Sequence, residues 1–164
     1  MRFKAVGSAV LVVAGAIVPC VAAGEGQAAE SWCEASWLGL SVQGEVGQAS
    51  GNQRTASIVL TNLSGESCVL QGFPGVDLAG VGEKGRASLP RTNEQGQVVQ
   101  LAPGGQAKST LTYMTGGGMP TEIIVTPPDS TNQLHAVWPA GLGSIGVWPE
   151  GATHPGTYIG PLRG

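Results

Sequence analysis

The chain has 164 residues, of which 41% are hydrophobic and 12% are charged, and its formal net charge at pH 7 is −3. This length suits one domain, and so few charges argue against disorder and against long surface helices with Glu–Lys pairs. The 27 glycines and 11 prolines favour short strands joined by many turns. The basic residues are scattered rather than clustered, so nucleic acid is not an expected partner.

The first part of the chain has the organisation of an export signal. Arg2 and Lys4 precede an uncharged apolar stretch, residues 5–23, that ends in small residues. These are the features of a signal peptide, which is removed from the mature protein. We expect cleavage after Ala23, with a cut near Ala28 as the alternative. The mature protein is expected to have no membrane span and to lie outside the cell or in the cell envelope. The predicted organisation is a signal peptide over residues 1–23, a short polar lead over 24–36 and a single domain over 37–164 that ends in a Pro/Gly-rich tail.

Two other interpretations of the leader stay open. Residues 17–20 (IVPC) are similar to a lipoprotein signal, in which Cys20 would carry the anchor, although Pro19 stands where that signal has a small residue. The apolar stretch is also about long enough for a retained transmembrane anchor, but Gly7, Gly15 and Pro19 weaken that interpretation. A soluble exported protein is therefore the first interpretation, and a lipoprotein anchored through Cys20 is the alternative.

The cysteines predict one disulfide bond. If Cys20 leaves with the signal peptide, Cys33 and Cys68 remain as an even pair in a chain bound for an oxidising compartment. A cross-link between them closes a loop of about 35 residues, for which chain entropy gives roughly 3–4 kcal/mol of stabilisation. The spacing matches neither a zinc site nor a Cys-x-x-Cys redox pair. We therefore expect a structural disulfide.

Short segments with apolar residues at every second position follow one another along the rest of the chain. Leu38, Leu40 and Val42 alternate with small or polar residues, and residues 55–61 show the clearest alternation. Further strands are expected at residues 68–70, 76–78, 99–101, 107–113, 123–125, 134–138 and 144–148, with turns at 44–53, 62–66, 80–85 and 103–105. About seven to nine short strands predict an all-β fold, an immunoglobulin-like antiparallel β-sandwich.

Three segments carry a resemblance to a known family. They read TNLSGESCVLQGFPGV at residues 61–76, VVQLAPGGQAKSTLTY at 98–113 and EIIVTPPD at 122–129, and an early cysteine, Cys33, precedes them. Together they resemble the exported actinobacterial family called domain of unknown function 4232. The resemblance implies an envelope or extracellular location and a β-sandwich; the family has no assigned activity, so it supplies no catalytic residues. Many members have two further cysteines in the carboxyl-terminal half, whereas this chain has none after Cys68.

One glycine motif matches a nucleotide-binding fingerprint in form only. Gly80, Gly82 and Gly85 spell Gly-x-Gly-x-x-Gly, which binds a pyrophosphate when a helix follows it. Residues 86–90 do not begin a helical pattern, and no acidic residue stands about 20 positions further on. We expect a loop here and no cofactor.

Few side chains offer catalytic chemistry. His135 and His154 are the only histidines, and no Gly-x-Ser-x-Gly elbow is present. His135 is expected to face solvent from a strand, and His154 to lie in a tail. The histidines and the dispersed carboxylates lack the spacing of metal ligands. We therefore expect no enzyme and no metal, with a small extracellular hydrolase or a ligand carrier as the alternative.

Two polar or aromatic motifs have competing interpretations. Asn62 begins an Asn-x-Ser glycosylation sequon, for which a turn is the preferred interpretation. Trp138 and Trp148 each precede a proline; if residues 144–148 pair with 134–138, the two indoles form an exposed platform for a sugar or a protein. Packing in the core is the favoured interpretation of these tryptophans, and the platform makes them the candidate binding surface.

The sequence therefore predicts a secreted, non-enzymatic module that binds a partner or has a structural role at the cell envelope or outside the cell. Its expected partner is an unidentified protein or glycan of the envelope. A ligand-carrying or hydrolytic domain would need convergent polar groups in a concave site, and the sequence shows no such convergence.

Overall fold

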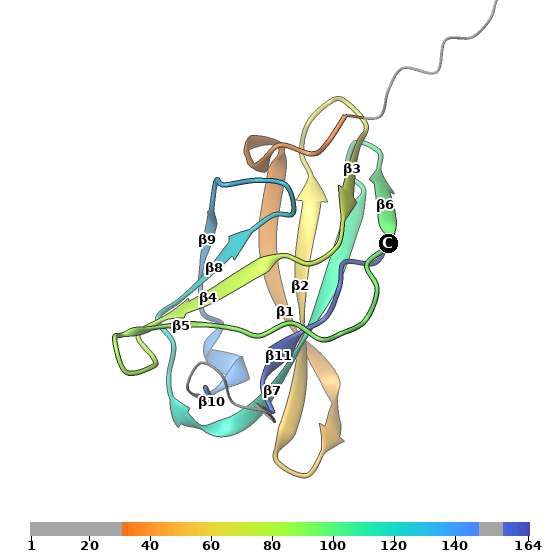
Figure 1. The fold of residues 1–164 in the computed structure, drawn as a ribbon. Coiled ribbons are helices and arrows are strands. Elements are labelled where there is room, and N and C mark those ends of the chain that lie inside the picture. Colours follow the sequence, from red (N-terminus) through yellow and green to blue (C-terminus); the bar gives the residue numbers. More distant parts are fainter. Residues whose placement is uncertain (1–30, 148–155) are drawn as a thin grey trace, which may run out of the picture.

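The computed structural model describes residues 31–147 and 156–164 and shows an all-β sandwich (Figure 1). One sheet has the order β1-β2-β7-β10, and β11 also pairs with β7. The second sheet has the order β5-β4-β8-β9, and β3 pairs with β6. The elements are η1 (Ala35–Trp37), β1 (Leu38–Ser50), β2 (Gln53–Asn62), β3 (Cys68–Gln71), β4 (Gly75–Ala79), β5 (Arg86–Ser88), β6 (Val98–Leu101), β7 (Gln106–Gly118), β8 (Glu122–Thr126), β9 (Leu134–Val137), η2 (Ala140–Leu142), β10 (Ile145–Gly146) and β11 (Tyr158–Ile159).

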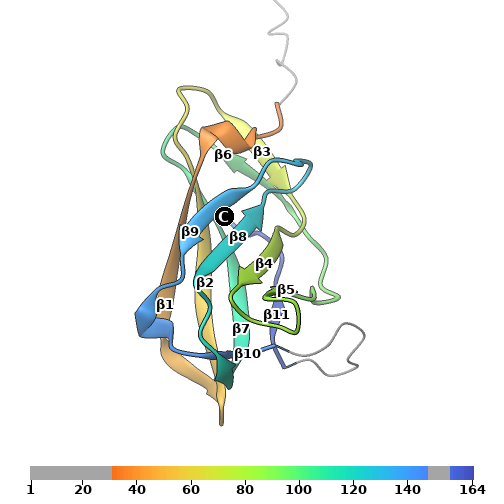
Figure 2. The same ribbon diagram turned by 90° about the vertical axis from the view of Figure 1, so that its left-hand side faces the viewer.

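The strand order confirms the predicted sandwich and is immunoglobulin-like. Taken along the chain, β1, β2 and β7 hold the places of strands A, B and E, and β5-β4-β8-β9 those of C′, C, F and G. Figure 2 shows β9, β8, β4 and β5 side by side in this order. The arrangement departs from the standard fold at strand D, because β6 pairs with β3 and the carboxyl-terminal β11 lies beside β7 instead.

The core lies between the two sheets and follows the alternation of the strands. Ile58 and Leu60 of β2 and Leu111 of β7 are fully buried, and they face Leu78 and Ile123 of the second sheet across one continuous cluster. Burying a side chain of this size stabilises a fold by roughly 1.5–3 kcal/mol. The period-2 pattern of the sequence therefore predicts the inward residues correctly.

The predicted turn at residues 44–53 is wrong in its extent. β1 continues to Ser50 and stays paired with β2, and the turn is confined to Gly51 and Asn52. The pairing shifts register between Gly44 and Gln48 and again before Ser50. Such bulges allow a strand to continue through residues that interrupt a regular alternation.

The carboxyl-terminal residues pack into the domain, where a tail was predicted. Ile159 and Leu162 are fully buried, and the Leu162 N–H donates to the Gly72 carbonyl over 2.8 Å. Arg163 exchanges two backbone hydrogen bonds with Lys108 of β7. The strands β5, β10 and β11 were not predicted as the structure has them, because two or three residues are too few to show an alternation.

The predicted disulfide joins Cys33 to Cys68, with Cα atoms 4.9 Å apart and both residues buried. Trp32 forms a bridge with Val69, and the Cys33 N–H donates to the Val69 carbonyl. Residues 31–33 of the predicted polar lead therefore lie against β3; the predicted signal peptide and Cys20 lie outside the described residues. No helix in the described part of the chain has the length and apolarity needed to cross a membrane.

Asn62 occupies the predicted turn and is fully buried. Its Nδ2 donates to the carbonyls of Glu66 and Leu101 over 2.7 and 3.1 Å, and its Oδ1 accepts from the Ser64 N–H over 3.0 Å. Its backbone N–H donates to the Gly105 carbonyl. The sequon is therefore a structural corner that holds the turn after β2 against the turn before β7.

Candidate functional site

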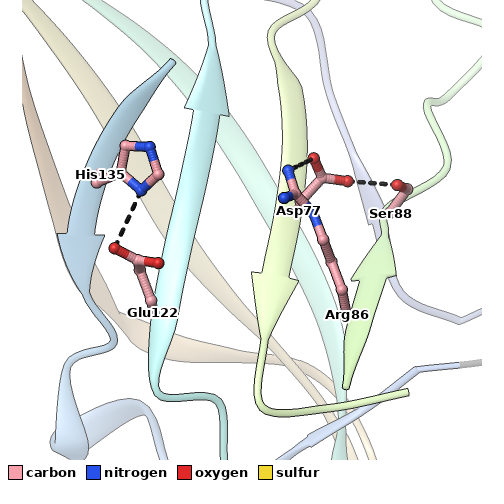
Figure 3. A network of polar contacts seen from close by, with 5 residues as sticks. All are labelled: Asp77, Arg86, Ser88, Glu122 and His135. Atoms are coloured by element: carbon pink, nitrogen blue, oxygen red, sulfur yellow. Dashed lines mark hydrogen bonds and ion pairs between the residues drawn. The ribbon is translucent and has the colours of Figure 1, made fainter. Parts of the chain in front are cut away.

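A layer of charged and polar side chains covers the outward side of the second sheet. We call this layer the polar face; it consists of Asp77 on β4, Arg86 and Ser88 on β5, Glu122 on β8 and His135 on β9 (Figure 3). Successive side chains of a strand point to opposite faces of the sheet, and the residues next to these in the chain point into the core. Val76 and Leu78 flank Asp77 and are buried, as is Ile123 beside Glu122.

The strand register arranges the polar face in two rows. One row runs across the sheet as Ser88, Asp77, Ile124 and His135. The next runs as Arg86, Ala79, Glu122 and Val137. Side chains that are directly or diagonally opposite on neighbouring strands are within reach of one another, so the rows are close enough for ion pairs between them.

Asp77 is the centre of the first group of polar contacts. Arg86 Nη2 lies 2.6 Å from Asp77 Oδ2, and Ser88 Oγ donates to Asp77 Oδ1 (Figure 3). The arginine is about half exposed, and pairs of this kind contribute only about 0–1 kcal/mol. The main effect of the contacts is to hold the three side chains in one arrangement.

The second group joins neighbouring strands through His135 and Glu122. His135 Nδ1 lies 3.0 Å from Glu122 Oε1, and both side chains are exposed to a considerable extent. The prediction that His135 faces solvent from a strand is confirmed. A histidine held by a carboxylate is also the base of a Ser-His-Asp triad, so its distance from a nucleophile decides what the pair can do.

The polar face does not bring a nucleophile to this histidine. Ser88 and His135 stand at opposite ends of one row, three strand spacings apart, which is about 14 Å. A nucleophile and its base need to approach to about 2.6–3.2 Å. Ser88 instead donates to Asp77. Within residues 31–147 and 156–164, no three His, Cys, Asp or Glu side chains gather as metal ligands do.

Trp138 lies in the core and not on an exposed platform. It is 3% exposed, its ring meets Tyr113 edge to face at a centroid distance of 6.2 Å, and its Nε1 donates to the Gly143 carbonyl over 2.9 Å. The favoured interpretation of Trp138, packing in the core, is therefore confirmed. The pairing of residues 144–148 with 134–138, on which the platform depended, does not form, because β10 pairs with β7. The turn η2 carries the chain from the second sheet to the first. Trp148 and His154 lie outside the described residues.

The Gly-x-Gly-x-x-Gly motif forms the hairpin turn between β4 and β5. The Gly80 N–H donates to the Gly85 carbonyl, and the Gly85 N–H donates to the Gly82 carbonyl. All three glycines have a positive φ, a conformation that other residues rarely adopt. A strand follows the motif instead of a helix, so the predicted loop is confirmed.

Sequence reasoning missed most of the polar face. Asp77, Arg86 and Glu122 were not predicted as site residues, because their grouping depends on which strands are neighbours. One signal was present in the sequence: Asp77 and Glu122 stand at alternate positions beside strongly apolar residues, where a sandwich strand presents its outer side.

The fold and the Cys33–Cys68 disulfide define this chain as a small disulfide-bonded β-sandwich domain, and the polar face covers the outward side of its second sheet. A family model described as "Domain of unknown function (DUF4232)" matches residues 33–157. The chain belongs to this family. Comparison with curated proteins and with solved structures gave no match.

Proposed function

We propose that this chain is an exported, non-enzymatic binding module that acts at the cell envelope or outside the cell and uses the polar face to bind its partner. The export part of the proposal is supported by the leader sequence and by the Cys33–Cys68 disulfide, since disulfides persist in oxidising compartments. The non-enzymatic part is supported by the separation of Ser88 from His135.

The observation that carries the binding proposal is Val137, which is 83% exposed and stands beside Glu122 at the edge of the polar face. Val137 pairs with Glu122 across the strands, so an apolar side chain lies beside the contact between Glu122 and His135. Binding surfaces commonly combine apolar contact with a polar surround. Side chains that are already held by one another lose less conformational freedom when a partner binds.

The experiment is a pull-down from envelope extract and culture fluid with the mature, oxidised protein. Val137→Glu places a charge in the polar face, and Val98→Glu is the matched control, because Val98 is also an exposed strand valine (56%) but lies on β6. We expect one saturable partner, protein or glycan, which Val137→Glu releases and Val98→Glu retains. Equal retention by both variants would exclude the polar face as the binding surface.

The same material tests the remaining parts of the proposal. An intact mass that begins after Ala23 supports soluble export, whereas a lipid-modified mass that begins at Cys20 identifies the lipoprotein alternative. Turnover in a hydrolase screen that is lost with His135→Ala contradicts the non-enzymatic assignment. A protein that retains no partner and turns over no substrate supports a purely structural role.

A further inference from the structure

A second candidate site lies at the end of the second sheet, next to the polar face. It is a pocket of about 370 Å³ between the link from β3 to β4 and the link from β8 to β9. Gly75 and Thr126, which are paired across β4 and β8, are among its lining residues. Its volume is at the lower end of the range for small-molecule sites, about 300–1,000 Å³.

Arg91 supplies the positive charge of this pocket. Its guanidinium lies 5.9 Å from the centroid of the Phe73 ring. The backbone around it is fixed, because Ile159 donates to the Pro90 carbonyl and accepts from the Thr92 N–H. Arg86 and Arg163 have carboxylate partners, whereas the described residues give Arg91 none. The guanidinium is thus positioned, and its charge is not neutralised.

The link from β8 to β9 contributes an acidic residue, Asp129, with an uncommon backbone conformation to the lining of the pocket. Asp129 has φ +56° and is, among the described residues, the one non-glycine residue with a positive φ. Residues held in this region cost energy and are often found at binding sites. Pro127 and Pro128 precede it and restrict the backbone. In the same turn, Ser130 Oγ accepts a hydrogen bond from the Asn132 N–H over 3.0 Å. These features restrict the backbone of this part of the lining.

These groups define the chemistry of a ligand. A guanidinium binds a carboxylate through two parallel hydrogen bonds. An aspartate carboxylate only accepts hydrogen bonds, so a ligand that binds Asp129 must supply donors such as hydroxyl groups. The negative charge of Asp129 also disfavours a multiply charged anion such as phosphate. The side-chain amide of Gln71, another lining residue, can donate and accept hydrogen bonds. We propose that this pocket binds a carboxylate-bearing sugar, with the carboxylate on Arg91 and the hydroxyls toward Asp129.

Calorimetric titration of the mature, oxidised protein tests this proposal directly. The probes are D-glucuronate and D-galacturonate, with D-glucose as the neutral sugar and acetate and phosphate as anions without a sugar ring. We expect at least one of the two acidic sugars to bind, with each control ligand about tenfold weaker or more. If acetate or phosphate binds as tightly as the acidic sugars, the pocket is a general anion site and the proposal is contradicted. Glucose binding as tightly as both acids, or no acidic sugar binding up to about 10 mM, would overturn the proposal.

Two variants locate the binding in the pocket. Arg91→Gln is expected to bring the affinity for the acidic sugar down to that for glucose. Lys84→Gln removes a positive charge from the hairpin after Ala79, at the other end of β4 from the pocket, and is expected to leave the affinity unchanged. Asp129→Asn retains a residue that tolerates positive φ, so it keeps the fold and is expected to weaken sugar binding about tenfold. If a folded Arg91→Gln protein binds the acidic sugar with unchanged affinity, the sugar binds elsewhere. If Arg91→Gln does not fold, unchanged affinity in Asp129→Asn leads to the same conclusion.

Discussion

Tyr113 and Trp138 meet edge to face, with an interplanar angle of 82°, and donate hydrogen bonds to two consecutive carbonyls. The Tyr113 hydroxyl donates to Leu142 over 3.0 Å and the Trp138 Nε1 to Gly143 over 2.9 Å. Each ring therefore fills the core with its apolar part while its polar atom holds the end of η2. The crossing of the chain between the two sheets depends on this pair.

Trp138→Ala is expected to lower the free energy of unfolding by about 3–5 kcal/mol, because it removes a buried aromatic ring and leaves a cavity. Urea unfolding followed by circular dichroism measures this change. Val137→Ala is the control, because Val137 precedes Trp138 in the chain but has an exposed side chain. Surface substitutions change the free energy of unfolding by no more than about 0.5 kcal/mol. Similar values for the two variants would contradict the burial of the indole.

The stability of the domain is expected to fall at alkaline pH through Tyr113. Burial raises the pKa of Tyr113 above the ordinary 10.0, and the charge of Arg54 and a hydrogen bond from it act in the opposite direction. A folded-state pKa above the unfolded one means that the associated stability is fully present below the unfolded pKa and is lost as the pH rises through the folded one.

The measurement for Tyr113 is urea unfolding at a series of pH values between about 8 and 11. Tyr113→Phe removes the hydroxyl and is expected to flatten the alkaline decline relative to the wild type. It also leaves the Leu142 carbonyl without this donor, which costs about 1–3 kcal/mol at neutral pH. An identical pH dependence in both proteins would show that Tyr113 does not cause the decline.

Asn62→Ala is expected to destabilise the domain by about 1–3 kcal/mol, because it leaves the buried carbonyl of Leu101 without the amide donor. Asn62→Asp has nearly the same shape but replaces the donor by an acceptor, and we expect at least as large an effect. Leu63→Ala is the control, since Leu63 is exposed in the same turn. Denaturation midpoints that are equal in all three variants would contradict the role of Asn62 as a corner.

The disulfide is expected to contribute about 3–4 kcal/mol. The mature, oxidised protein should show no reactive thiol at Cys33 or Cys68 in a denaturing thiol titration. The double variant Cys33→Ser with Cys68→Ser should unfold at a correspondingly lower denaturant concentration, and reducing agent should then have no further effect. Two titratable thiols in correctly exported protein would contradict the cross-link.

The fold was predictable from the sequence wherever a strand was long enough to show its alternation. β2 and β8 have apolar residues at the positions that meet in the core, and Cys33 and Cys68 are a pair once the leader is set aside. β5 has three residues and β11 has two. Their pairing is set by the neighbours they meet in space, so the sequence pattern carries almost no information about it.

The candidate site was less predictable than the fold. The solvent-facing position of His135 follows from its alternation with Leu134 and Ala136. Its contact with Glu122, 13 residues away, requires the register of β8 against β9. The burial of Trp138 depends on η2, which turns the chain toward β7 instead of back along β9. A tryptophan before a proline gives no local signal of that direction.

The register shifts in β1 also affect how the molecule can associate with copies of itself. An open strand edge is a template for pairing with another chain, and proteins protect such edges by bending them or keeping them short. β1 bends at its bulges, and the far flank of β7 is covered by the two-residue strands β10 and β11. Beyond Gly44 the edge of β1 is therefore irregular, and the far flank of β7 is partly covered, which disfavours the growth of intermolecular sheets along these two stretches at high concentration.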